Sequence, residues 1–78
     1  MKSVQVLGPG CKRCAATEAM VRAAAARLGI PVEVEKVTDY AAIARFGILS
    51  TPGIVIDGKV VHAGGLPDER ALERWLQA

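Results

Sequence analysis

Aromatic, histidine and cysteine residues are scarce in this chain. Its 78 residues include only three aromatic residues, one histidine and two cysteines. The net charge is only +2, and the basic residues are scattered among acidic ones. Such a chain lacks the concentrated basic patch and the stacking groups of a nucleic-acid-binding surface. Two thiols and one histidine also leave a four-ligand zinc site incomplete.

Long hydrophobic runs are absent as well. No apolar run approaches the roughly 20 residues that a membrane-spanning helix needs. The first short apolar run ends at the turn signal GPG, residues 8–10, which leaves no room for the core of a signal peptide. We therefore expect a cytoplasmic protein. Thiols in that compartment are kept reduced, so a close pair of cysteines is more often catalytic or metal-binding than structural.

The composition is typical of a folded globular domain. Half of the residues are hydrophobic, and charges of both signs are spread along the chain. A length of 78 residues predicts a single domain over residues 1–78, with a small core that buries about 60 to 65% of the unfolded surface.

Hydrophobic periodicity and turn residues predict an α/β fold with the element order βαβαββα. The expected elements are a strand at Ser3–Leu7, a helix at Lys12–Leu28, a strand at Val32–Val37, a short helix capped by Thr38 or Asp39 and ending at Phe46, a hairpin of Gly53–Asp57 and Lys59–Ala63 turning at Asp57–Gly58, and a helix starting at Pro67–Asp68. The right-handed crossover rule makes the first two strands parallel, with the hairpin antiparallel beside them. This arrangement is a four-stranded mixed sheet flanked by three helices, which should cover both of its faces.

Both cysteines stand in GPGCKRC, at the start of the long helix. At about 100° per residue, Cys11 faces outward and Cys14 leans toward the apolar stripe of that helix. Backbone N–H groups and the helix dipole at this position stabilise a thiolate. Lys12 and Arg13 add positive charge, and no acid precedes Glu18, so the pKa of the Cys11 thiol should be lowered. Cys11 is therefore the candidate nucleophile and Cys14 its resolving partner.

A CxxC pair has other possible uses. It can bind a soft metal such as copper or zinc, or it can be a structural bridge. A bridge that closes only four residues stabilises the fold by roughly 2 kcal/mol, which makes it a poor crosslink. Copper carriers with CxxC usually continue βαββαβ rather than the order expected here. A redox-inert adaptor that binds partners near Ile48 and Pro52 stays open as a third reading.

Three segments together, GPGCKRC, Ser50–Pro52 and Asp57–Lys59, resemble the thioredoxin-like superfamily across nearly the whole chain. The most similar members are small glutaredoxin-sized redox proteins with GxGCxxC near the N-terminus. The resemblance implies a thioredoxin-like fold and thiol–disulfide oxidoreductase activity. It also implies a cis Thr51–Pro52 peptide bond against the cysteine pair, with the backbone of Thr51 offered to an extended substrate. Lys12 and Arg13 would flank that substrate and lower the pKa of the Cys11 thiol.

Partners follow from the same resemblance. We expect a monomer, without a cofactor, that acts on a disulfide-containing protein or small molecule and takes electrons from a reductase or from glutathione. Gly64, Gly65 and Asp68 look like the residues with which glutaredoxins hold glutathione, although their spacing from Pro52 is about two residues longer. The alternative is that both glycines let the chain leave the hairpin and Asp68 caps the last helix.

The sequence departs from the thioredoxin pattern at three places. Gly10 stands where thioredoxins carry Trp before the first cysteine, and Lys12–Arg13 replace Gly–Pro between the two cysteines. No acid lies in the first strand to take a proton from Cys14, so water would have to carry it. The strongly reducing potential of thioredoxins therefore does not transfer, and the direction of electron flow stays open.

Outside these motifs, few residues suggest chemistry. His62 has no second ligand at metal-binding spacing, so we expect an exposed strand residue there. The aromatic residues are interpreted as core residues, and one of them, Tyr40, could instead line the substrate groove. They are Tyr40, Phe46 and Trp75.

Overall fold

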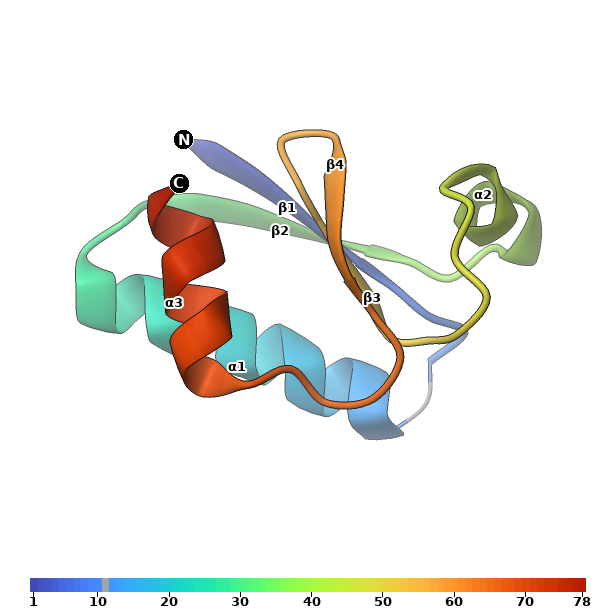
Figure 1. The fold of residues 1–78 in the computed structure, drawn as a ribbon, viewed down its shortest axis with the longest axis horizontal. Helices are drawn as coiled ribbons and strands as arrows, with labels where there is room; N and C mark the ends of the chain where they lie inside the picture. The colour runs from blue at the N-terminus through green and yellow to red at the C-terminus, as the bar shows by residue number, and fades with distance from the viewer. Residues whose placement is uncertain (11) are drawn as a thin grey trace.

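The computed structural model describes residues 1–10 and 12–78, and the prediction made for Cys11 lies outside them. The described elements are β1 (Lys2–Leu7), α1 (Lys12–Leu28), β2 (Val32–Val37), α2 (Tyr40–Arg45), β3 (Gly53–Ile56), β4 (Lys59–Ala63) and α3 (Glu69–Gln77). Their order is the predicted βαβαββα, and no predicted boundary differs from the observed one by more than two residues. Figure 1 shows the three helices around the sheet.

The sheet has the strand order β2-β1-β3-β4 in the described part of the chain. β1 pairs with β2 in parallel, whereas β3 runs antiparallel to both β1 and β4. Parallel strands need a long crossover, which α1 supplies, and the antiparallel pair β3–β4 needs only a tight turn. The mixed sheet and three helices confirm the predicted thioredoxin-like α/β fold.

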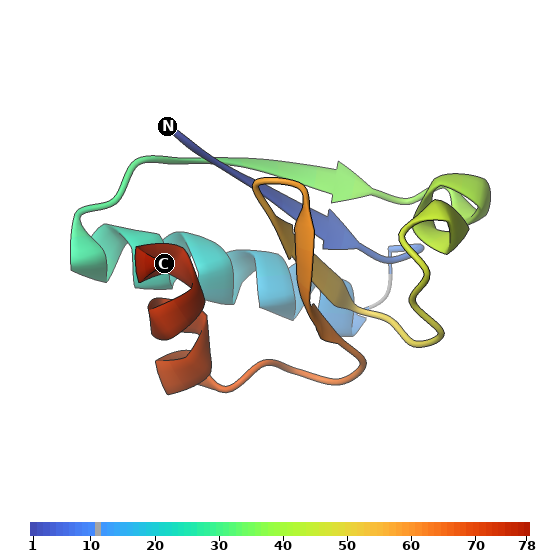
Figure 2. The same cartoon turned by 45° about the horizontal axis from the view of Figure 1, so that its top comes forward.

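α1 and α3 lie side by side on one face of the sheet, as Figures 1 and 2 both show. The main core forms between them and the strands: Val4, Val21, Ala24, Ala25, Ile54, Ile56, Leu72 and Leu76. An ion pair of 3.0 Å between Arg27 Nη2 and Glu73 Oε2 joins the outer sides of the two helices. The apolar stripe predicted for α1 and the buried residues Leu72 and Leu76 of α3 therefore pack against the same face.

The opposite face is covered at one end only. Ile43 of α2 packs against Leu7 and Val55 there, with Phe46 at the edge of the cluster. Farther along the same face, the side chain of Gln5 donates a solvent-exposed hydrogen bond to the carboxylate of Glu35. Helices thus lie on both faces, but the six-residue α2 shields only the end of the sheet at which β1 finishes.

Polar side chains and glycines end the elements. Asp39, rather than Thr38, caps α2 by accepting a 2.9 Å hydrogen bond from the backbone N–H of Ala42. The β3–β4 turn has positive φ angles at Asp57 (50°) and Gly58 (84°), as its Asp–Gly sequence predicts. Among the described residues, no helix is both long enough and apolar enough to cross a membrane.

Candidate active site

Cys14 lies in the first turn of α1 and is almost completely buried, with 4% of its surface exposed. Its Sγ packs against Gly8, directly after β1. A Cβ atom at Gly8 would overlap this Sγ, and it would lie 3.2 Å from Cβ of Cys14 and 3.8 Å from Cβ of Thr51. Only a glycine leaves room for the thiol here. The inward orientation predicted for Cys14 is therefore observed, and the side chain of Thr51 lies beside the same glycine.

The pairing of β1 with β3 brings these distant residues together. Leu7 is the register partner of Gly53, so Gly8 leaves β1 beside the residues that enter β3. The Thr51–Pro52 peptide bond is cis, which is the geometry that the resemblance implied. Pro52 is buried and Thr51 is half-buried. Thr51 and Cys14 of the first turn of α1 thus both lie beside Gly8, although about 40 residues separate them in the sequence.

The first turn of α1 carries only positive side-chain charge. Lys12 and Arg13 are both exposed, and the turn contains no acidic residue. The next acid, Glu18, is held by Arg22 at 3.0 Å and by Lys36 at 3.6 Å. The hydrogen bond from Arg22 is the main cause that lowers the pKa of the Glu18 carboxyl. The charges near Cys14 therefore favour an anion at the start of the helix.

A hollow of about 300 Å³ adjoins Thr51 on the side of α2. It is lined by Pro9, Tyr40, Ile43, Ala44, Ile48, Leu49, Ser50 and Thr51. Tyr40 is 74% exposed, so the interpretation of Tyr40 as a core aromatic was wrong; its ring lies at the start of a short helix that leaves it in solvent. Leu49 is fully exposed beside it, and sequence reasoning did not select this residue. The sequence signal that could have identified Leu49 is its position as an apolar residue in the loop between Gly47 and Ser50–Pro52.

Comparisons with known proteins agree with this architecture. A protein-family model described as a thioredoxin domain matches residues 2–77. The chain belongs to the thioredoxin domain family. It is 33% identical over 78 residues to a thioredoxin of Methanocaldococcus jannaschii, covering all of this chain and 90% of that protein. It is 30% identical over 76 residues to a thioredoxin of Methanothermobacter thermautotrophicus, covering 97% of this chain and 99% of that protein.

Membership of the thioredoxin family supports a thiol–disulfide redox role. Gly64, Gly65 and Asp68, which resemble the glutathione-binding residues of glutaredoxins, have structural roles in this chain. Asp68 caps α3, because its carboxylate accepts a 3.0 Å hydrogen bond from the backbone N–H of Ala71. Gly64 and Gly65 have φ angles of 88° and 72° and turn the chain away from β4. These contacts favour the structural reading of all three residues.

The prediction that His62 is an exposed strand residue was wrong. It is half-buried, and its Nε2 lies 3.0 Å from the carbonyl oxygen of Gly65. Its ring centroid is 5.7 Å from that of Trp75. The strand pattern could not show this contact, because it depends on how α3 returns onto β4. Within residues 1–10 and 12–78, no group of three or more potential metal ligands is found.

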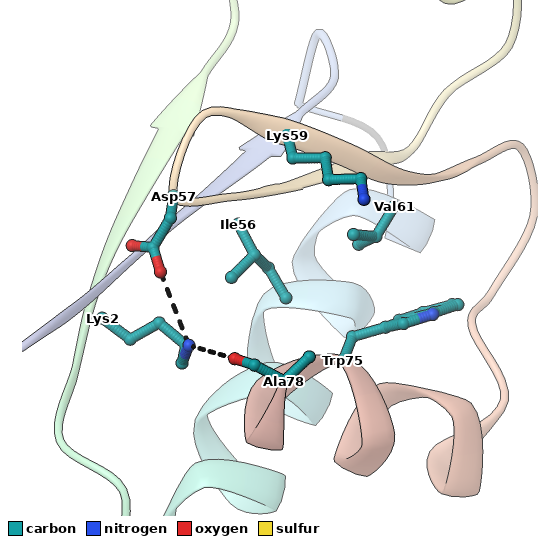
Figure 3. Close-up of a pocket in the computed structure, with 7 residues that line it drawn as sticks. All are labelled: Lys2, Ile56, Asp57, Lys59, Val61, Trp75 and Ala78. Carbon is teal, nitrogen blue, oxygen red and sulfur yellow. Dashed lines mark hydrogen bonds and ion pairs between the residues drawn. The ribbon is translucent and has the colours of Figure 1, made fainter.

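A second hollow, of about 340 Å³, lies at the other end of β1, away from Cys14 (Figure 3). Lys2 Nζ lies 3.4 Å from Asp57 Oδ2 and 3.0 Å from the carbonyl oxygen of Ala78, which ties the β3–β4 turn to the end of α3. Asp57 also accepts a 3.0 Å hydrogen bond from the backbone N–H of Ser3, and this bond is the main cause that lowers the pKa of its carboxyl. The predicted site residues are not part of this hollow.

Proposed function

We propose that this thioredoxin-family chain is a thiol–disulfide oxidoreductase in which Cys11 attacks the substrate and Cys14 resolves the intermediate. The observation that supports the proposal is the packing of the Cys14 thiol against Gly8 at the start of α1, with the side chain of Thr51, which precedes the cis bond to Pro52, beside the same glycine. Burial suits a resolving thiol, because it reacts only with a partner already bound next to it. Cys11 directly precedes Lys12, where α1 begins, and its role rests on this sequence position.

The reaction proceeds in two balanced exchanges. The Cys11 thiolate attacks one sulfur of the substrate disulfide, whose S–S bond breaks and releases one substrate thiolate. Cys14 then gives up its proton to water, and its thiolate attacks the Cys11 sulfur of the mixed disulfide. This second exchange forms a Cys11–Cys14 bond and releases the other substrate thiolate. Two electrons pass to the substrate, and an external dithiol reductase or glutathione restores the two thiols.

Substrate binding is proposed for the segment in front of Cys14. An extended peptide would pair with the backbone of Thr51, while Pro52 sets the position of that backbone. Lys12 and Arg13, both exposed, would attract substrates with acidic residues near the disulfide and stabilise the attacking thiolate. We propose this activity for a cytoplasmic, single-domain monomer that needs no cofactor.

Turnover of a disulfide substrate tests the proposal with two matched variants. The reduced protein should reduce an acidic peptide disulfide, and Cys11→Ser should abolish the reaction. Cys14→Ser should instead accumulate the mixed disulfide with the substrate, since the first exchange remains possible and the second does not. The pH dependence of Cys11 alkylation should give a midpoint below the ordinary thiol value of about 8.5.

The same preparations separate the oxidoreductase from the alternatives. A copper or zinc carrier would bind Cu(I) or Zn²⁺ stoichiometrically and show no turnover with any disulfide, and this result would refute the proposal. An adaptor without redox function would form no reversible Cys11–Cys14 disulfide in a glutathione redox buffer. Equal activity of the wild type and Cys11→Ser would be equally damaging, because no other thiolate is placed to make the first attack.

A further inference from the structure

The ring of His62 is fixed from two sides. A carbonyl oxygen only accepts hydrogen bonds, so the 3.0 Å contact between His62 Nε2 and Gly65 O requires that Nε2 carries the proton and donates. On its other side the ring packs against Trp75 of α3, with an angle of 37° between the two planes. The side chain of His62 is thus a fixed donor on β4 that holds the carbonyl group of Gly65.

The turn that His62 holds is bonded directly to the proline of the candidate active site. The backbone N–H of Gly64 donates a 2.8 Å hydrogen bond to the carbonyl oxygen of Pro52. The same glycine packs closely on the loop before the proline, since a Cβ atom at Gly64 would lie 3.0 Å from Cβ of Ser50. The Gly64–Gly65 turn therefore lies between His62 on one side and Ser50–Pro52 on the other.

We propose that His62 is a positioning residue for the Thr51–Pro52 segment. It acts through two hydrogen bonds in series, from His62 Nε2 to Gly65 O and from Gly64 N to Pro52 O. Two consecutive glycines with positive φ have wide backbone freedom, and the His62 bond limits that freedom. The consequence for catalysis rests on the proposed function, whereas the mechanical link between His62 and Pro52 does not.

A loosened turn should affect large and small thiol reagents differently. A peptide disulfide must align with the backbone of Thr51, so its reaction needs Pro52 held in place. A small alkylating reagent needs only the thiolate. Loss of the His62 donor should therefore lower the rate constant for a peptide disulfide roughly two- to tenfold, the range expected for one hydrogen bond, and leave the alkylation rate of Cys11 unchanged.

Three variants of His62 isolate the donated hydrogen bond. Gln carries its amide nitrogen at about the distance of the histidine Nε2, so His62→Gln keeps a donor for Gly65. His62→Asn is one carbon shorter and cannot reach, and His62→Phe keeps a ring against Trp75 without a donor. Val61→Ala is the matched control, because Val61 lies on the same strand and packs on the main core.

The direct measurement is hydrogen exchange at the amide of Gly64. We expect His62→Asn and His62→Phe to raise its exchange rate roughly two- to tenfold, His62→Gln to stay near the wild type, and Val61→Ala to leave it unchanged despite a lower melting temperature. Unchanged exchange in the Asn and Phe variants would overturn the inference. So would an equal increase in Val61→Ala, which would show a general loss of stability.

The activity readout keeps this inference distinct from the proposed function. If the exchange at Gly64 responds as expected but the wild type reduces no disulfide, the proposed function fails and the link from His62 to Pro52 stands. If the wild type is active, and the Asn and Phe variants keep the full rate with the peptide disulfide, the positioning role of His62 is refuted.

Discussion

The space at Gly8 offers the sharpest test of the site geometry. Gly8 is not among the described glycines with positive φ, so its backbone accepts alanine without strain. The added Cβ would nevertheless overlap Sγ of Cys14 and approach its Cβ to 3.2 Å. Both Cys14 and the end of β1 are held by the core, so the overlap must displace one of them. Gly8→Ala therefore tests whether the buried thiol occupies the space next to β1.

Overpacking of this kind costs about 1–3 kcal/mol. For a domain of this size, each kcal/mol lowers the melting temperature by roughly 4–8 °C. Thermal and denaturant unfolding of the reduced protein should show this loss. Stopped-flow release of substrate from the mixed disulfide should also slow in Gly8→Ala, because a displaced Cys14 reaches the Cys11 sulfur less readily.

Two further variants separate the overlap from general effects. Gly47 has a φ of 77°, and no atom lies within 4 Å of a Cβ built there. Gly47→Ala should therefore lower the free energy of unfolding by about 1 kcal/mol through backbone strain, and it should leave the rate of substrate release from the mixed disulfide unchanged. In a Cys14→Ala background, which lacks Sγ, Gly8→Ala should cost clearly less than in the wild type. An identical cost in both backgrounds, or a Gly8→Ala protein as stable as the wild type, would refute the packing argument.

Three other predictions concern residues around the fold. Asp68→Ala should lower the free energy of unfolding by about 1 kcal/mol and leave disulfide reduction unchanged, because Asp68 caps α3; a loss of glutathione-dependent activity alone would contradict this. The pKa of Asp57 is lowered in the folded state, so its contribution to stability is present above the unfolded value of about 3.9 and is lost as the pH falls through the lower folded value. Asp57→Asn should therefore make unfolding less dependent on pH below about pH 4, as acid titrations followed by circular dichroism would show. Leu49→Ser should weaken binding of an apolar peptide disulfide, measured as a higher KM, without lowering the melting temperature, since Leu49 is fully exposed.

Local chemistry made much of the fold predictable. The run from Lys12 to Leu28 contains neither Gly nor Pro and ends at Gly29, and it forms α1 with these bounds. Asp57–Gly58 adopts the positive φ angles that a two-residue hairpin turn needs. The inward orientation of Cys14 followed from helical periodicity alone, because Thr17 and Val21, three and seven residues farther along the helix, lie on the same buried side. Each of these features depends on interactions between residues that are close in the sequence.

The errors concern residues whose surroundings come from other elements. Tyr40 was expected in the core, but α2 is short and covers only one end of its face, so the ring stays in solvent. His62 was expected in solvent, but α3 brings Trp75 against it, and the Gly64–Gly65 turn brings a carbonyl to its Nε2. No local pattern distinguishes these outcomes, since burial depends on what packs on the strand or helix from elsewhere.

The amino-acid sequence by itself determined the order of the elements, the cysteine pair at the start of a helix, and the turns and caps that end each element. Tertiary structure alone decided that Gly8, Cys14 and Thr51 meet, and that His62 is linked to Pro52. The physical reason is the register of the sheet, in which Leu7 pairs with Gly53 and Gly53 pairs with Ala63, and which the whole buried face of the sheet specifies.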